Sequence, residues 1–157
     1  MSLVKILNQH CKNIDALIEC THRERDAIVY NRMNEMSDIA FSKSTLLRQA
    51  EELEAERRRL CEELTGTSFK NSASMDEAVG QLPSEFRHEI EALRETIRQK
   101  SNELQRETEI NTVLMKDQLE YARFMLSILS NARQKDFYAS NGAKRAPTEG
   151  AILNRKG

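Results

Sequence analysis

The feature that most constrains the fold of this chain is the near absence of glycine and proline from most of its length. Only five of the 157 residues are Gly and two are Pro, and three of those glycines and one proline lie in the stretch 136–157. Because these two residues interrupt helices most strongly, the chain before residue 136 can sustain long helices. The sequence therefore predicts an all-α body followed by a tail of a different kind.

Apolar residues recur at alternating three- and four-residue spacings in three segments, which is the pattern of helices that pack along their length. The pattern predicts helices over about 3–30, 34–64 and 83–133, with a turn near Asn31 and Asn34 and a left-handed cap at Gly66. Residues 67–74 read as a loop, and 75–82 as one short helical turn. We expect an antiparallel bundle of three long helices over residues 1–133.

The third predicted helix is too long to match the other two. About 50 helical residues reach about 75 Å, whereas the first two helices reach about 42 to 45 Å. The third helix must therefore extend past its partners or break. The polar stretch 98–112 is the candidate break, with Ser101 or Asn102 as a new N-cap. Of these alternatives we favour one continuous helix.

Residues 134–157 are expected to form a flexible basic tail. From Arg133 onward there are six basic and two acidic residues, a balance of +4, and since the whole chain carries −1, the body carries −5. Ordering about 20 residues costs about 20 to 40 kcal/mol, more than the four large apolar side chains of this segment could return. We therefore expect the tail to be disordered on its own.

The composition argues against several classes of protein. A net charge near zero is unlike that of general nucleic-acid or acidic-membrane binders, which use a basic face. No apolar run approaches the roughly 18 to 20 residues that span a bilayer, and the N-terminus does not resemble a secretory signal. Three cysteines without a CxxC pair indicate reduced thiols. These features favour a cytosolic protein without stable membrane insertion.

Catalytic and metal-binding motifs are also missing from the sequence. It has no glycine-rich phosphate loop, nucleophile elbow or constellation of paired carboxylates, so we expect no enzyme activity and no cofactor. The nearest approach to a metal site is His10 and Cys11 with Cys20 and His22. Their spacing does not bring all four to one helix face, so we expect no metal site.

Charged residues interrupt the apolar stripes at Lys43, Arg57 and Glu107. We expect all three to lie at seam edges, with their stems packed and their charges in water, because burying an unpaired charge is costly. The arginines at 57–59 could form a basic docking spot, but pairing of Glu54 with Arg58 across one helical turn favours a solvated face.

The third helix carries more apolar residues near its end than one seam requires. The surplus comprises Val113, Leu114, Met115, Leu119, Tyr121, Phe124, Met125, Leu126, Ile128 and Leu129. Unbranched Met is adaptable packing material and suits a surface that accepts another helix. Two interpretations stay open, a bundle core and a docking surface.

Three segments together resemble the FlgN-type flagellar export chaperones. They are SKSTLLRQAEELEAERRRL in the second helix, INTVLMKDQLEYARFMLSIL in the third, and the closing YASNGAKR with LNRKG. The family pattern has an Asn followed by apolar residues in the long helix, which Asn111 matches here. It also has a Tyr a few residues before a Gly, matched in spacing by Tyr138 and Gly142. The resemblance extends over nearly the whole chain.

The resemblance implies a cytosolic chaperone of flagellar type III export. Such proteins hold hook-filament junction proteins by their C-terminal helices and deliver them to the export gate and its ATPase complex. The implied export-gate contacts are Tyr138 and Gly142. The resemblance gives Asn111 as a client-binding residue, and together with the surplus apolar residues and the adjacent tail it leads us to expect the client helix to dock on Met115, Leu119, Ala122, Met125 and Leu126.

Two other readings compete with the chaperone. A structural coiled-coil scaffold, or a chaperone of another secretion system, would share the apolar stripes, and an obligate parallel dimer would favour the scaffold. A nucleic-acid binder would use the tail and the arginines at 57–59, but the acidic body argues against it. We expect a monomer or weak dimer that binds no nucleic acid.

Overall fold

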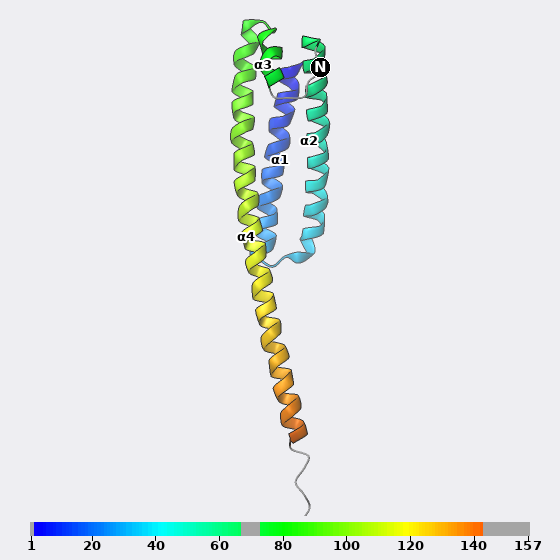
Figure 1. Ribbon diagram of the computed structural model, residues 1–157, viewed down its shortest axis with the longest axis vertical. Helices are drawn as coiled ribbons and strands as arrows, with labels where there is room; N and C mark the ends of the chain where they lie inside the picture. The colour runs from blue at the N-terminus through cyan, green and yellow to red at the C-terminus, as the bar shows by residue number, and fades with distance from the viewer. Residues whose placement is uncertain (1, 67–72, 143–157) are drawn as a thin grey trace, which may run out of the picture. The chain divides into compact units, whose positions relative to one another are not determined.

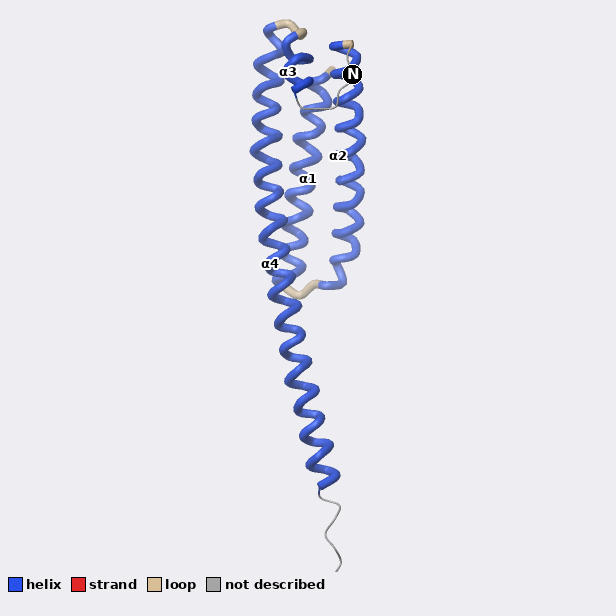
Figure 2. Tube along the Cα trace, in the orientation of Figure 1, coloured by secondary structure: helices blue, strands red, loops and turns tan. Residues whose placement is uncertain are grey.

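The computed structural model describes residues 2–66 and 73–142, and side chains over 2–66 and 75–131. Every regular element in these ranges is a helix (Figures 1 and 2). The elements are α1 (Leu3–Val29), the 3-10 helix η1 (Met33–Glu35), α2 (Met36–Thr65), α3 (Ala73–Gly80) and α4 (Ser84–Gly142). The chain divides into a first unit, Met1–Lys116, and a second unit, Asp117–Gly157. The prediction of an all-α fold with long packed helices is confirmed.

The first helix begins and ends at residues that cap it chemically. The Ser2 hydroxyl accepts a hydrogen bond from the Lys5 backbone N–H at 3.4 Å. At the other end Asn31 has a φ of 53°, and the Arg32 N–H donates to the Ala27 carbonyl at 2.8 Å. This is the Schellman arrangement, in which a left-handed residue closes the last helical turn. The predicted turn at Asn31 is confirmed.

The second long helix ends at Gly66, also as the sequence predicts. Gly66 has a φ of 68°, and its N–H donates to the Glu62 carbonyl at 2.8 Å. Glycine takes this left-handed conformation without the steric cost that a Cβ would add. α2 therefore stops here.

α1 supplies most of the buried side chains of the first unit and lies between α2 and α4 in Figure 1. At its N-terminal end, residues from four helices form one apolar cluster: Leu3, Leu7, Cys61, Met75, Ala78, Val79 and Ile90. A second cluster joins Cys20 and Ala27 of α1 to Ile39 of α2. The predicted short turn is thus α3, whose apolar side chains complete the first cluster.

Contacts between α1 and α4 run in the same order along both helices. Leu7 packs in one cluster with Ile90, Asp15 pairs with Lys100, and Arg25 pairs with Glu107 further along. α1 and the first part of α4 are therefore parallel, and α2 is antiparallel to α1 through the tight connection at 30–35.

α4 is continuous through Ser101 and Asn102, so the favoured alternative of an unbroken helix is confirmed. The predicted end near residue 133 is wrong, because the helix continues to Gly142. Residues 133–142 include Arg, Gln, Lys and Ala, which are good helix formers, and proline is absent until Pro147. Residues 134–142 are therefore helical in backbone, and the rest of the predicted tail, 143–157, lies outside the described residues.

The three cysteines are free and buried. Burial raises the pKa of the Cys11, Cys20 and Cys61 thiols, because an apolar environment disfavours the thiolate. The predicted placement of the cysteines within helices is confirmed.

Ile90 provides a test of the four-helix cluster, because its side chain is completely buried. Ile90→Ala should lower the free energy of unfolding by about 2 to 5 kcal/mol, since the substitution removes buried apolar contacts and leaves a cavity. Leu47→Ala is the control: Leu47 is 50% exposed, and its loss should change stability by less than about 0.5 kcal/mol. Urea denaturation measures both, and equal stabilities would contradict the assigned core.

Candidate functional site

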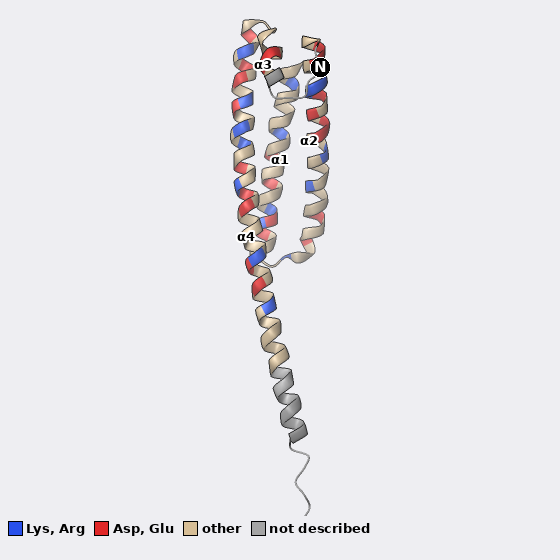
Figure 3. Cartoon of the chain, viewed as in Figure 1, with Lys and Arg blue, Asp and Glu red and all other residues tan. Residues whose placement is uncertain are grey.

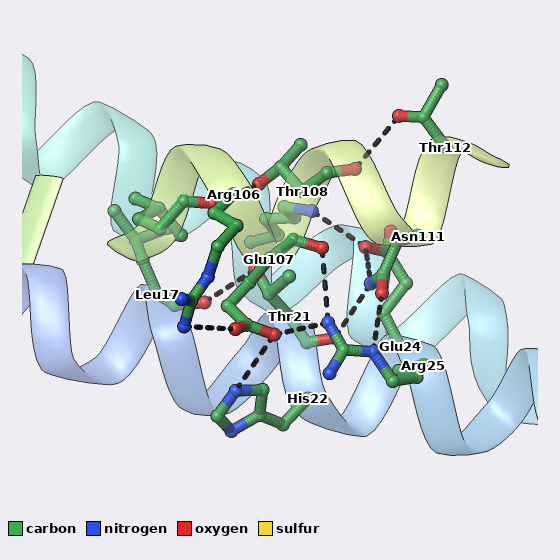
Figure 4. A network of polar contacts seen from close by, with 12 residues as sticks. Leu17, Thr21, His22, Glu24, Arg25, Arg106, Glu107, Thr108, Asn111 and Thr112 are labelled. Atoms are coloured by element: carbon green, nitrogen blue, oxygen red, sulfur yellow. Dashed lines mark hydrogen bonds and ion pairs between the residues drawn. The ribbon is translucent and has the colours of Figure 1, made fainter. Parts of the chain in front are cut away.

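A buried set of polar side chains joins α1 to α4 in the first unit (Figure 4). At its centre Asn111 is 2% exposed, and its amide nitrogen donates to the Thr21 carbonyl and to Glu24 Oε2, both at 2.8 Å. The Asn111 carbonyl oxygen accepts from Arg25 Nε at 3.1 Å. Both ends of the Asn111 amide therefore have partners on α1.

Glu107 lies one turn before Asn111 and is also buried. Arg25 Nη2 pairs with the Glu107 carboxylate and donates to its backbone carbonyl at 3.3 Å, while Arg106 and His22 approach the same carboxylate at 3.3 and 3.5 Å. The hydrogen bond from Arg25 lowers the pKa of Glu107. The expectation that Glu107 keeps its charge in water is therefore wrong: a complementary arginine on α1 makes burial of the carboxylate tolerable.

Lys43 extends this network to α2. Its Nζ donates to Glu24 Oε2 at 2.9 Å, the same carboxylate oxygen that accepts from Asn111. Lys43, like Arg57, is half-buried at a seam edge as predicted, with a glutamate partner. We call the whole set the polar layer, which consists of Thr21, Glu24, Arg25, Lys43, Glu107 and Asn111.

The polar layer favours one register between α1 and α4. Sliding α4 by one turn would leave the Arg25 guanidinium, the Glu107 carboxylate and the Asn111 amide without partners inside the bundle. Such unmet groups cost about 1 to 3 kcal/mol each. The layer therefore holds the α4 segment that immediately precedes the surplus apolar residues.

The structure separates the predicted client-binding residues into two groups. Asn111 lies inside the bundle, so a client could touch it only by opening the α1–α4 contact. Met115 in the first unit is exposed, and so are the four predicted residues of the second unit, Leu119, Ala122, Met125 and Leu126. Tyr138 and Gly142 belong to the last turns of α4, where the structure describes the backbone but no side chains.

The described side chains of the second unit, 117–131, are all exposed. Seven of them are large and apolar, with exposures between 39% and 65%, and we call them the apolar face: Leu119, Tyr121, Phe124, Met125, Leu126, Ile128 and Leu129. Charged residues are sparse here by comparison with the first unit (Figure 3). Exposed apolar surface of this extent on one helix is typical of a protein–protein interaction site.

Six of the seven residues of the apolar face fall on two heptad stripes, and Phe124 lies beside the second. Leu119, Leu126 and Leu129 follow one stripe, and Tyr121, Met125 and Ile128 follow a second. The stripes are offset by one residue, which corresponds to about 100° around a helix. The face is therefore wider than the single seam of a two-stranded coiled coil, and it offers two adjacent rows to a partner.

The arginines at 57–59 are neutralised by glutamates on the same helix. Arg57 and Arg58 pair with Glu54 at 2.7 and 2.9 Å, and Arg59 pairs with Glu63 at 3.2 Å. The hydrogen bond from Arg57, with that from Arg58, lowers the pKa of Glu54 to about 2. This pairing supports a solvated face over a basic docking spot.

Sequence reasoning missed the α1 half of the polar layer. Thr21 and Arg25 fall on the apolar stripe of the first helix, just as Glu107 and Asn111 fall on that of the third. The sequence thus showed polar residues on the apolar stripes of both helices. The opposite charges of Arg25 and Glu107 could have suggested that these two residues pair. What the sequence lacked was the relative position of the two helices.

Over the described part of the chain, no group of three or more His, Cys, Asp or Glu side chains could hold a metal ion. Within the same residues, no helix has both the length and the apolar character needed to cross a membrane.

Replacing Asn111 should destabilise the bundle. Asn111→Ala leaves the Thr21 carbonyl, Glu24 and Arg25 each without one hydrogen-bond partner, so the free energy of unfolding should fall by about 1 to 3 kcal/mol. Gln105→Ala is the matched control, because Gln105 bonds only to Glu109 on the exposed side of α4. A wild-type melting temperature for Asn111→Ala would show that the layer contributes no stability.

The lowered pKa of Glu54 predicts a pH-dependent contribution to stability. A carboxyl group whose pKa is lower in the folded state stabilises the fold above its unfolded pKa, near 4.5, and loses this effect as the pH falls toward about 2. Because Glu54 is one-third exposed, we expect only about 1 kcal/mol. Glu54→Gln should therefore differ from wild type at pH 6, and in urea denaturation the difference should shrink below about pH 4.5 and largely vanish only by about pH 2.

Glu52→Gln controls for the change in charge, since Glu52 is exposed and its contact with Arg48 is 4.0 Å long. A gap between Glu54→Gln and wild type that stayed constant over this pH range would refute the assigned ion pair.

A family model described as FlgN protein matches residues 1–146, which is nearly the whole chain. No curated protein and no solved structure gives a significant match. The matched range includes the first unit with its polar layer and the apolar face of α4. The long-helix fold and the family match agree with the resemblance carried by the sequence motifs, and the chain belongs to the FlgN family of flagellar export chaperones.

Proposed function

We propose that this chaperone binds the C-terminal helices of hook-filament junction proteins on the apolar face of α4 and delivers them to the flagellar export gate. The observation that carries the proposal is the run of seven exposed, large apolar side chains within residues 117–131. Membership of a flagellar export chaperone family supports a client of this class, and the apolar face offers a surface of suitable chemistry.

The composition of the face suits an amphipathic helix. Two adjacent apolar rows can receive the i, i+3, i+4 and i+7 side chains of a docking helix. Met125 lies in one row, and its unbranched side chain can adapt to clients of different shape. The contacts proposed from the sequence are Met115, Leu119, Ala122, Met125 and Leu126. We leave Asn111 out of the docking surface, because its amide is already occupied in the polar layer.

The exposed charges of the same segment can orient the client. Asp117, Glu120 and Arg123 are exposed, and their spacing puts them outside the two apolar rows, with Asp117 and Arg123 at opposite edges of the apolar face. Charged groups at the rim of an interface contribute little affinity, but they disfavour wrong registers and partners. A client helix with a basic residue near Asp117 and an acidic residue near Arg123 would be favoured. Binding would take place in the cytoplasm, before the client reaches the export gate and its ATPase complex, and Tyr138 with Gly142 would contact the gate.

Introducing a charge on the apolar face tests the docking surface. Met125→Glu should weaken binding of a junction-protein C-terminal fragment at least tenfold in calorimetric titration, because a carboxylate would have to be desolvated against the client. Leu47→Glu is the matched control, an exposed apolar residue of α2 that becomes the same acid, and its affinity should equal that of wild type.

Tyr138→Ala separates delivery from binding. It should leave the affinity for the fragment unchanged and reduce secretion of the junction protein in cells. Equal affinity of wild type, Met125→Glu and Leu47→Glu would refute the docking surface. The molecular mass in solution tests the alternative that the protein is a structural scaffold. An obligate parallel dimer that binds no client would favour the scaffold and contradict our proposal.

A further inference from the structure

A second candidate binding site lies within the first unit, in a groove between α1 and α2. The groove has a volume of about 590 Å³. α1 contributes Gln9, Lys12 and Asn13, and α2 contributes Gln49, Glu52, Leu53 and Glu56. None of these residues belongs to the polar layer or to the apolar face.

The buried side chain in this groove is Asn13, which is only 8% exposed. Its amide nitrogen donates to the Leu46 carbonyl at 3.1 Å and lies 3.5 Å from Gln49 Oε1. Because a backbone carbonyl can only accept, this contact fixes which end of the Asn13 amide points toward α2. The other end, Asn13 Oδ1, is buried and has no donor among the protein atoms.

Gln9 adds a second acceptor of the same kind. Its Oε1 is also buried without a donor from the protein, and it lies one helical turn before Asn13 on the same wall of the groove. Two buried carbonyl oxygens with unmet acceptor capacity are costly unless a donor reaches them. These two oxygens therefore lack a donor from the protein.

The charges of the groove point to a cationic donor. Glu52 and Glu56 contribute two carboxylates from α2, and Lys12 contributes one exposed ammonium from α1, so the lining is net negative. The contact from Arg48 to Glu52 is 4.0 Å long and exposed, and it neutralises that carboxylate only weakly. Half-buried Leu53 offers an apolar patch beside these groups.

We propose that the α1–α2 groove binds an arginine side chain presented by a partner protein. A guanidinium carries five donors in one plane and can serve several oxygens at once, which a single ammonium cannot do in fixed geometry. Its positive charge matches Glu52 and Glu56, and its aliphatic stem matches Leu53. Lys12, Gln49 and Glu52 are exposed at the groove, so a polypeptide carrying the arginine can approach from the side.

This proposal does not depend on the client-docking surface. Every residue of the groove lies in the first unit, and variants of Met125 leave it intact. Failure of one proposal would therefore leave the other standing.

The test uses the full chain and N-acetyl-L-argininamide as a probe of an arginine within a polypeptide. NMR titration should give saturable shifts of the Asn13 and Gln9 side-chain amide signals. The neutral isostere N-acetyl-L-citrullinamide should give none at the same concentration. Glu56→Gln should weaken probe binding by about five- to tenfold, as loss of a charge-assisted hydrogen bond predicts. Glu51→Gln, the same change on the same helix outside the groove, should have no effect.

Each other outcome would overturn the proposal in a specific way. Absence of saturable shifts would mean that only water supplies the donors. Equal binding of the citrulline probe would show that the positive charge plays no role. Equal effects of Glu51→Gln and Glu56→Gln would show that the probe is attracted by the overall negative charge of residues 1–132 and not by the groove. Free L-arginine binding more than tenfold tighter than the blocked probe would assign the groove to a small molecule instead of a partner protein.

Discussion

The contact of Arg25 with Glu107 and Asn111 is the constraint on which the arrangement of the first unit depends. Apolar stripes at heptad spacing can slide past one another with modest loss, because one leucine replaces another. The Arg25 guanidinium cannot slide in this way, because it loses the Glu107 carboxylate and the Asn111 amide when the helices shift. The apolar clusters then supply most of the stability, and the polar layer selects which of several similar packings is adopted. Lys43 brings α2 into the same selection through Glu24.

This division of labour explains how far the sequence could predict the fold. Helix ends at Asn31 and Gly66 were predictable because local backbone chemistry decides them. The end of α4 was misplaced, because the first glycine after Arg133 is Gly142 and the residues before it include several good helix formers. Burial of Glu107 was also mispredicted, because it depends on Arg25, which is far away in sequence. Local signals are readable along the chain, whereas pairings between helices are not.

The candidate sites follow the same logic. The sequence showed that the apolar face has more apolar residues than one helix seam needs. It did not decide whether these residues are buried in the bundle core or exposed as a docking surface. Asn111 matched the family pattern and was therefore grouped with the exposed residues from Met115 onward. Its position on the apolar stripe of the helix indicated more correctly that it is buried against α1. The groove lined by Asn13 had no sequence signal, since it exists only where two helices meet.

The three buried cysteines have a practical consequence for studying this chaperone. Cys61 lies in the cluster closed by α3, Cys20 in the cluster with Ile39, and Cys11 between them along α1. Each thiol has a raised pKa and little exposure, so alkylating reagents can reach it only when the surrounding helices separate. The native chain thus carries three chemical reporters of local opening. Their labelling rates would show which end of the bundle loosens first, without any foreign probe in the protein.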